Sequence, residues 1–326
     1  MYTLLLTLRD RAQYTESFFD YLNQINFLEK IFVADGSSDL GRVSVQKIIK
    51  NYPNLNIEYH DFGFDSSYKR YYQKLRNSVG LIKSPYVLLI DNDDYVNVEG
   101  CLEACRMMDE DPSIVACGRI ADLYLFPRVQ SCKIRKSSSI LQDSPEERLA
   151  YFAIRPDAIW GLMLKVEGLL EAFNAVSDAN FEQLHLMELL FNLNVIQRGR
   201  ISRIGSKPIL YRRAFSEESS SAENLKDISL LEKIFLKNFY EQWALVEKYY
   251  LELGFSDLQI LRRYWVNACI SQSESSSKKQ SRTRVGLYSS WFIFLRSLYY
   301  KLRFRSSIPM DVLRAEKKRV LATREI

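Results

Sequence analysis

The stretch YVLLIDNDD, residues 86–94, marks the point where the fold and its chemistry meet. It starts with a short apolar run, which is typical of a strand buried on both faces of a parallel sheet. Carboxylates follow directly, at Asp91, Asp93 and Asp94. Because ligands bind beyond the carboxyl ends of the strands in such a sheet, we expect a binding site at this acidic run.

The residues before this strand alternate short β-rich runs with longer amphipathic patterns, which is typical of parallel strands joined by crossover helices. The sequence therefore predicts an α/β fold, with a Rossmann-like, mostly parallel central sheet that is flanked by helices. The other predicted strands are Tyr2–Leu8, Lys30–Asp35 and Asn56–Phe62, and the predicted helices are Arg11–Asn26, Arg42–Asn51 and Ser66–Ile82.

The residues after the acidic run predict further elements of both kinds. At Ser144-Pro145, a proline behind a serine and ahead of two glutamates predicts a helix start. The stretch Ser131–Ser139 is polar and predicts a loop. Helices are also predicted at Val96–Asp109 and from Ser177-Asp178 to Gly199, and extended chain at Ile114–Phe126, Arg200–Ile204 and Lys207–Arg212.

The Ser/Glu-rich stretch Ser216–Glu223 is the predicted boundary between two regions. We expect one domain at residues 1–215, with two halves at 1–112 and 113–215. Residues 216–326 predict a helical region, and Lys and Arg dominate its end. Such a basic end favours an acidic partner, and a solvated helical face explains it equally well.

The composition favours a folded protein in a reducing compartment. Of the 326 residues, 47% are hydrophobic, and no apolar run approaches the roughly 20 residues that cross a bilayer as a helix. The apolar start meets Arg9 and Asp10 too early for a signal peptide, so we expect a buried first strand. The five cysteines form no CxxC pair and indicate neither a zinc site nor a disulfide framework. We therefore expect a cytoplasmic location.

The acidic run also predicts a bound cation. Close carboxylates resist ionising together unless a positive charge offsets them. Ligation by one or two carboxylates, completed by water and substrate phosphates, is typical of Mg²⁺ and Mn²⁺. We expect Mn²⁺ or Mg²⁺ here, where it would neutralise a departing diphosphate. A solvated acidic turn is the alternative interpretation.

Three motifs carry a resemblance to a known family: Asp35-Gly36-Ser37-Ser38-Asp39, then Arg76-Asn77, then the acidic run. In their order, spacing and strand context they resemble the inverting family 2 glycosyltransferases of GT-A fold, over residues 1–215. The resemblance implies transfer of a sugar from a nucleoside-diphosphate sugar, which we expect to be UDP-linked. It implies a catalytic domain at residues 1–215, with a nucleotide-sugar half at 1–112 and an acceptor half at 113–215. The implied acceptor is a glycan or a lipid-linked molecule in bacterial-type surface polysaccharide synthesis.

The resemblance also implies roles for single residues. Asp35 would bind the nucleotide base or the ribose, and Arg76 and Asn77 would line the same pocket. The Asp-x-Asp motif would comprise Asp91, which binds ribose or metal, Asn92 in the nucleotide site, and Asp93, which binds the metal at the diphosphate. A capped turn between strand and helix explains Asp35 and its neighbours equally well.

An inverting transfer also needs a base that takes the proton from the acceptor hydroxyl. The usual Glu-Asp pair of the family is absent, and the candidates are Asp178 and Glu182. The two lie four positions apart and would share one helix face, which His185 would continue. We favour Asp178, at the predicted helix start, although it would serve equally well as a cap. Glu188 is a weaker third candidate.

Two aromatic features bear on the acceptor. Trp160, followed by Gly161, would pack against a sugar ring, although core packing is common for a lone tryptophan. Residues 288–305 interleave aromatic with basic residues, which is typical of an interfacial helix at an anionic membrane surface. This stretch favours a peripheral protein on the inner face of the membrane, and packing on the catalytic domain is the alternative.

Other functions are compatible with parts of the pattern. A sugar nucleotidyltransferase would use a similar sheet, but its glycine-rich loop is missing after the first strand. A catalytically inactive nucleotide-sugar-binding module would explain the missing Glu-Asp pair. No nucleic acid partner is expected, because the basic end carries no recognised motif. The sugar, the linkage and the oligomeric state are not encoded in these motifs.

Overall fold

The computed structural model describes residues 1–126, 129–178, 181, 184–203, 205–213, 239–268 and 311. Three features of interest lie outside these residues: the predicted boundary Ser216–Glu223, the candidate base Glu182 and the predicted membrane-surface stretch 288–305. The domain limits therefore stay predictions.

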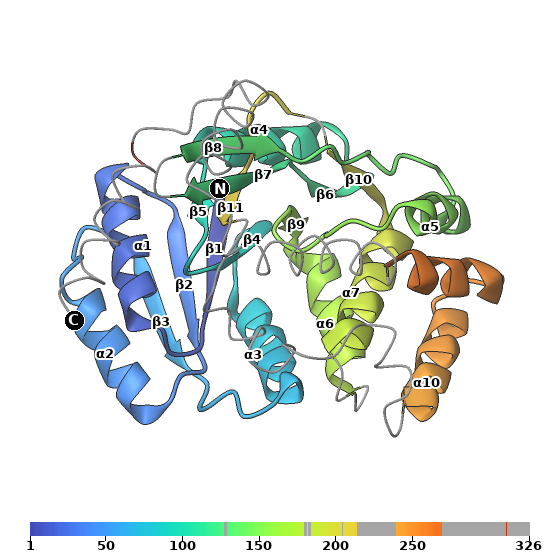
Figure 1. The fold of residues 1–326 in the computed structure, drawn as a ribbon, viewed down its shortest axis with the longest axis horizontal. Helices are drawn as coiled ribbons and strands as arrows, with labels where there is room; N and C mark the ends of the chain where they lie inside the picture. Colours follow the sequence, from blue (N-terminus) through green and yellow to red (C-terminus); the bar gives the residue numbers. More distant parts are fainter. Residues whose placement is uncertain are drawn as a thin grey trace, which may run out of the picture.

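A seven-stranded sheet forms the centre of the molecule, in the order β10-β6-β9-β4-β1-β2-β3 (Figure 1). In this sheet β1 pairs in parallel with both β2 and β4, and β2 pairs in parallel with β3. Leu8 therefore lies opposite Asp35, and Thr7 opposite Asp91. The predicted mostly parallel α/β fold is confirmed. The four strands are β1 (Tyr2–Leu8), β2 (Lys30–Asp35), β3 (Ile57–Asp61) and β4 (Tyr86–Asp91).

Helices cover both faces of this sheet. In Figure 1, α1 and α2 pack together on one side, and α3, α6 and α7 form a row on the other. Serine side chains cap the N-termini of α2 and α3. Ser38 accepts a hydrogen bond from the Gly41 amide and Ser67 one from the Arg70 amide, both at 3.3 Å. The bounds are α1 (Ala12–Gln24), α2 (Asp39–Ile49), α3 (Tyr68–Leu81), α6 (Val166–Asp178) and α7 (Leu184–Arg198).

Beyond β4 the main sheet becomes mixed. β9 (Met163–Lys165) runs antiparallel to β4 and to β6 (Ile114–Cys117), and β10 (Arg200–Ser202) runs parallel to β6. The predicted helix start at Ser144-Pro145 is present, and Ser144 and Glu147 form a capping box at the start of α5. Further helices are α4 (Val98–Glu110), α5 (Pro145–Ile154) and α10 (Phe239–Glu252), and α10 contacts α7.

A second sheet of four strands, in the order β5-β11-β7-β8, lies beside the main one (Figure 1). β5 directly follows the acidic run and pairs with β11, where Tyr95 lies opposite Tyr211. This pairing brings Arg212 next to the acidic run. The strands are β5 (Tyr95–Val96), β7 (Ile120–Phe126), β8 (Val129–Ile134) and β11 (Leu210–Arg213).

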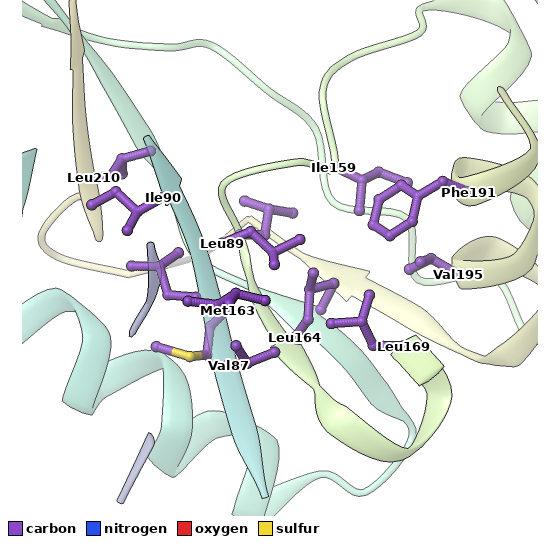
Figure 2. Packing of buried hydrophobic residues seen from close by; sticks show 14 of the residues in the cluster. Val87, Leu89, Ile90, Ile159, Met163, Leu164, Leu169, Phe191, Val195 and Leu210 are labelled. Atoms are coloured by element: carbon purple, nitrogen blue, oxygen red, sulfur yellow. The ribbon is translucent and has the colours of Figure 1, made fainter. Parts of the chain in front are cut away.

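One hydrophobic core joins β4 to the helices behind the site. Figure 2 shows Leu89 of β4 near Leu164 of β9, with Leu169 of α6 and Phe191 of α7 pointing toward them. These side chains are at most 2% exposed. Burial of each contributes about 1.5–3 kcal/mol, so the packing fixes α7 relative to the acidic end of β4.

Two predicted elements differ from the observed ones. The stretch Ser131–Ser139, predicted as a loop, begins inside β8, which pairs with β7. Ser177-Asp178, predicted to start a helix, instead ends α6, and the next helix starts at Leu184. Apolar residues continue at helical spacing on both sides of that break, so the pattern did not mark it. None of the described helices has the length and hydropathy that a membrane span needs.

Candidate functional site

A cleft of about 820 Å³ opens at the carboxyl ends of β1 and β4. One wall consists of residues that follow these strands, among them Arg11, Asp91 and Asp93. Residues 65–67, just before α3, and residues 68, 69, 71 and 72 at its start also line the cleft. The opposite wall consists of residues 158–160 and the first half of α7. A ligand in this cleft would contact both predicted halves of the domain.

Two carboxylates of the acidic run line the cleft. Asp91 Oδ1 accepts a hydrogen bond from the Thr7 hydroxyl at 3.0 Å. Burial raises the pKa of Asp91, and the nearby charge of Asp93 raises it further. Asp93 forms an ion pair with Arg11, with 2.9 Å between Oδ2 and Nη2. The two carboxylates therefore lie where an added positive charge would be stabilised.

The other members of the acidic run hold its turn in place. Asn92 donates to the Thr15 hydroxyl at 3.0 Å and also lines the cleft. Asp94 Oδ2 lies 3.7 Å from Arg212 Nε, and the Arg213 amide donates to Asp94 at 3.3 Å. Burial raises the pKa of Asp94 to about 8. The turn is thus attached to α1 on one side and to β11 on the other.

The residues after β1 form a strained turn at the rim of the cleft. Asp10 and Arg11 both have left-handed backbones, with φ of 58° and 64°, which is uncommon for residues other than glycine. Asp10 Oδ1 accepts from the Ser38 amide at 3.1 Å and from its hydroxyl at 2.6 Å. These contacts and the ion pair to Asp93 hold the turn, so that Arg11 lines the cleft.

Four cationic side chains line the cleft beside the two carboxylates: Arg9, Arg11, Lys69 and Arg212. The guanidinium of Arg11 also lies 4.3 Å from the centre of the Tyr14 ring. Burial works to lower the pKa of Arg11, but Asp93 outweighs it and the pKa is raised, so Arg11 stays charged. Such a group of cations suits a polyanionic ligand such as a diphosphate.

Asp35 lies beside the cleft and not in its lining. It is fully buried at the end of β2, where Oδ1 accepts from the Ser37 amide at 2.8 Å and Oδ2 from the Tyr59 hydroxyl at 2.9 Å. A Cβ on the next residue, Gly36, would lie 2.1 Å from Asp65 Oδ2, so a larger residue would displace the Asp65 side chain. Asp35 therefore shapes the loop next to the cleft.

A buried ion pair supports the cleft from below. Lys74 Nζ of α3 lies 2.5 Å from Asp65 Oδ2 and donates to the Leu8 carbonyl at 2.9 Å. Burial raises the pKa of Asp65 and lowers that of Lys74, and the ion pair opposes both changes. The pair attaches α3 to the end of β1, directly under the residues that line the cleft.

Arg76 and Asn77, predicted to line the nucleotide pocket, are exposed on α3 and lie outside the cleft lining. Arg76 Nη1 lies 3.6 Å from Asp178 Oδ1, and both side chains are largely exposed. The helix turns Tyr71, Tyr72 and Lys74 inward instead. The predicted motif is therefore on the right helix but on its outer face.

The predicted base Asp178 also lies outside the cleft. It is the last residue of α6 and its side chain is 64% exposed. Asp178 and His185 are on different helices, so the predicted shared helix face is wrong. Glu188 of α7 lines the cleft, where its carboxylate lies 3.3 Å from His185 Nδ1 and remains about half exposed. Glu188 is the carboxylate that α7 presents to the cleft.

Trp160 is both a packing residue and a lining residue. Its ring centre lies 5.9 Å from that of Phe191 and 6.4 Å from that of Tyr71, which also lines the cleft. Arg212 Nη2 donates to the Trp160 carbonyl at 3.3 Å and holds the segment against β11. Trp160 therefore lines the same cleft as Asp93.

Asp91 and Asp93 fit a divalent cation that is shared with a ligand. Two carboxylates, completed by water and by phosphate oxygens, form a donor set that suits Mg²⁺ or Mn²⁺. Among the described residues, no group of three or more His, Cys, Asp or Glu side chains could hold a metal ion. The donor set thus fits an ion bound together with a phosphate better than a closed structural site.

Comparisons with known proteins show which fold this chain shares. No protein-family model and no curated protein sequence matches the chain. Among solved structures, the chain has the fold of a glycosyltransferase. That protein is S. aureus TarS, whose complex with UDP-GlcNAc aligns at a TM-score of 0.52 and 16% identity, over 81% of this chain and 70% of TarS 1–349.

The TarS complex with UDP gives the same result, with a TM-score of 0.51 and 16% identity over 84% of this chain and 73% of that one. The mannosyltransferase PcManGT from Pyrobaculum calidifontis, in complex with GDP-Man and Mn²⁺, aligns at only 0.45, with 12% identity over 92% and 84% of the two chains. At these identities the comparison with TarS shows the shared fold alone.

Several cleft residues were not predicted from the sequence. Arg9 and Arg11 follow the first strand, which is the position where a parallel sheet binds ligands, so their placement could have been found. Lys74 does not line the cleft but supports it, and its spacing marked it, since it lies on the buried face of α3 one turn after Tyr71. Arg212 had no such signal, because it reaches the cleft only through the pairing of β11 with β5.

Proposed function

We propose that this protein is a glycosyltransferase that transfers a sugar from a nucleoside-diphosphate sugar, expected to be UDP-linked, to a glycan or lipid-linked acceptor. The observation that carries the proposal is the composition of one cleft. Asp91 and Asp93 line it together with four cationic side chains, and Trp160 and Glu188 line its opposite wall. The fold shared with TarS, which was solved with UDP-GlcNAc, supports the same function.

The donor would lie along the ends of β1, β2 and β4. The diphosphate would contact the cations that line the cleft, and Asp91 and Asp93 would hold Mn²⁺ or Mg²⁺ beside it. When bound, such an ion would neutralise charge on the leaving diphosphate. Asp35 would act through the loop that it shapes, which places it near the nucleoside.

We assign the role of base to Glu188 rather than to Asp178. Glu188 would take the proton from an acceptor hydroxyl. The hydroxyl oxygen would then form a bond to the anomeric carbon from the side opposite the diphosphate. The bond between that carbon and the diphosphate oxygen would break, and the nucleoside diphosphate would leave. The configuration at the anomeric carbon of the transferred sugar would then be inverted. The half-exposed carboxylate of Glu188 in the cleft supports this assignment.

The cellular setting that we propose is bacterial-type surface polysaccharide synthesis on the inner face of the membrane. It rests on residues 288–305, whose sequence is typical of an interfacial helix. A catalytically inactive nucleotide-sugar-binding protein with the same fold remains the alternative, because the family's usual Glu-Asp pair is absent.

The test is a panel of nucleotide sugars, each added with Mn²⁺ or with a chelator, in which the melting temperature is measured. A ligand at 100 times its Kd stabilises the native state by about 2.7 kcal/mol, so a true donor should raise the melting temperature clearly. The rise should need the metal and should disappear in Asp93→Ala. If no nucleotide sugar stabilises the chain, the proposal is wrong; binding without hydrolysis or transfer would identify the inactive alternative.

A further inference from the structure

A second cavity, of about 560 Å³, lies apart from the cleft just described. It is bounded by β7 and β8, by residues 135–140, by the end of α5 and by Arg203. No step of the proposed sugar transfer uses these residues. The cavity and the cleft share one boundary, because residues 155–157 line the cavity and residues 158–160 line the cleft.

Positive charge dominates the lining of this cavity. Five cationic side chains line it, against the two carboxylates of Asp122 and Asp157, so that its formal charge is +3. Both carboxylates already form ion pairs with arginines of the cavity lining. Such an excess of positive charge attracts a multiply charged anion. The cationic residues are Lys133, Arg135, Lys136, Arg155 and Arg203.

The two arginines of the wall are fixed by these carboxylates. Arg135 Nη2 lies 2.7 Å from Asp122 Oδ1. Arg203, whose side chain is 2% exposed, lies 3.5 Å from Asp157 Oδ2 and donates to the Ala158 carbonyl at 2.7 Å. Burial lowers the pKa of Arg203 more than Asp157 restores it. A further anion near Arg203 would therefore be stabilised.

The loop that carries Lys136 is held at several points. The Arg135 amide donates to the Ile120 carbonyl at 2.9 Å, and the Ile140 amide donates to the Ile201 carbonyl at 2.8 Å. Between them, the Ser137 hydroxyl donates to Asp157. The loop is therefore ordered before any ligand binds, which lowers the entropic cost of binding.

Lys136 and Arg155 are the exposed cations of the cavity. Within the described residues, neither forms an ion pair with a carboxylate. Next to them, Tyr151 and Ile154 of α5 line the cavity and are 40% and 64% exposed. An anionic group beside an apolar chain would match this combination of exposed cations and exposed apolar side chains.

We propose that this cavity binds the phosphate or diphosphate group of a lipid-linked acceptor, with the first part of the lipid chain against Tyr151 and Ile154. The inference rests on the proposed function for the ligand's role as acceptor. The segment 155–160 would then connect the anchored phosphate to the sugar-transfer cleft, where Trp160 and Glu188 stand. The anionic group is positioned by Arg203 and Arg135 and contacted by Lys136 and Arg155.

The test is calorimetric titration of the full chain, in a chelating buffer without nucleotide, with inorganic pyrophosphate, farnesyl diphosphate and farnesol as probes. The two exposed cations would make charge-assisted contacts with the anion. The double variant Lys136→Ala/Arg155→Ala should therefore lower the affinity for both diphosphates by about tenfold or more. The exchange Tyr151→Ser/Ile154→Ser should weaken farnesyl diphosphate and leave pyrophosphate unchanged. Farnesol should not bind measurably.

Two control variants make the result specific. Lys83→Ala/Arg106→Ala removes two exposed cations elsewhere and should leave both affinities unchanged. Arg9→Ala/Lys69→Ala removes cations of the cleft. If only this cleft variant loses pyrophosphate binding, or if Lys136→Ala/Arg155→Ala binds like wild type, the cavity is not the anion site. Equal affinity for the two diphosphates would exclude the lipid chain and overturn the proposed acceptor.

The titration separates this inference from the proposed function, because it uses no nucleotide sugar. A chain that binds farnesyl diphosphate in the cavity but is stabilised by no nucleotide sugar would keep the anion site and contradict sugar transfer. A chain that is stabilised by a nucleotide sugar but binds no diphosphate here would contradict the cavity assignment alone.

Discussion

The two walls of the cleft differ in how the chain builds them. The donor wall consists of residues that directly follow β1 and β4, so that neighbouring parallel strands bring Arg11 and Asp91 together. The opposite wall consists of a segment around Trp160 and of Glu188 in the middle of a helix. Strand ends of one sheet meet by geometry, whereas a helix face meets a loop only through packing. For this reason Asp91 and Asp93 could be placed at this edge from the sequence, whereas Glu188 was only a weaker third candidate for the base.

The largest effect is expected for Asp93→Ala, which removes one of the two donor-wall carboxylates. If the donor wall supplies the charge that holds a metal beside the diphosphate, transfer should fall by about a thousandfold or more. We would measure kcat/KM with Mn²⁺, together with the melting temperature.

The control is Asp39→Ala, which removes an acid at the start of α2 that is 92% exposed. Its kcat/KM should stay within about twofold of wild type, since exposed substitutions have small effects. If Asp93→Ala retained wild-type kcat/KM, the donor wall would not be the catalytic wall.

The support under the donor wall is tested by Lys74→Met. This exchange leaves Asp65 buried without its partner, which should cost about 3–5 kcal/mol of unfolding free energy. Urea unfolding measures the loss. The double variant Lys74→Met/Asp65→Leu should recover part of it, because it removes the uncompensated charge. An unchanged midpoint in Lys74→Met would show that the pair does not stabilise the fold.

The opposite wall is tested by Glu188→Gln. A base that loses its proton acceptor should lower kcat by about a hundredfold, while the affinity for the donor stays unchanged. The matched exchange Asp178→Asn, outside the cleft, should leave kcat within about twofold. Rapid turnover of Glu188→Gln together with an inactive Asp178→Asn would reverse the assignment.

The smallest expected effect concerns the loop next to the cleft. Tyr59→Phe removes the hydroxyl that donates to Asp35 at 2.9 Å. The loss of this hydrogen bond should lower the free energy of unfolding by about 1 kcal/mol. We expect a several-fold weaker affinity for the free nucleoside diphosphate, measured by calorimetry, and a nearly unchanged kcat. A full loss of binding would instead place Asp35 in direct contact with the nucleotide.

The candidate site could be predicted in part. The position of Asp91 and Asp93 followed from the apolar strand before them, and both line the cleft. Arg76 and Asn77 were placed on the correct helix but on its inner face, and they are exposed. In an α-helix, a shift of one or two positions changes which face a residue occupies, and the motif alone does not fix that face.

The sequence by itself determined the mostly parallel sheet, the succession along the chain of its first four strands and the helices between them, and the acidic edge where a ligand would bind. These depend on hydrophobic patterns that are local to each element. Only the tertiary structure decided that Glu188 lies in the cleft and Asp178 outside it. The same holds for Arg212, which β11 brings to Asp94 across more than one hundred residues. Such contacts depend on how distant elements pack, and a local pattern does not record that packing.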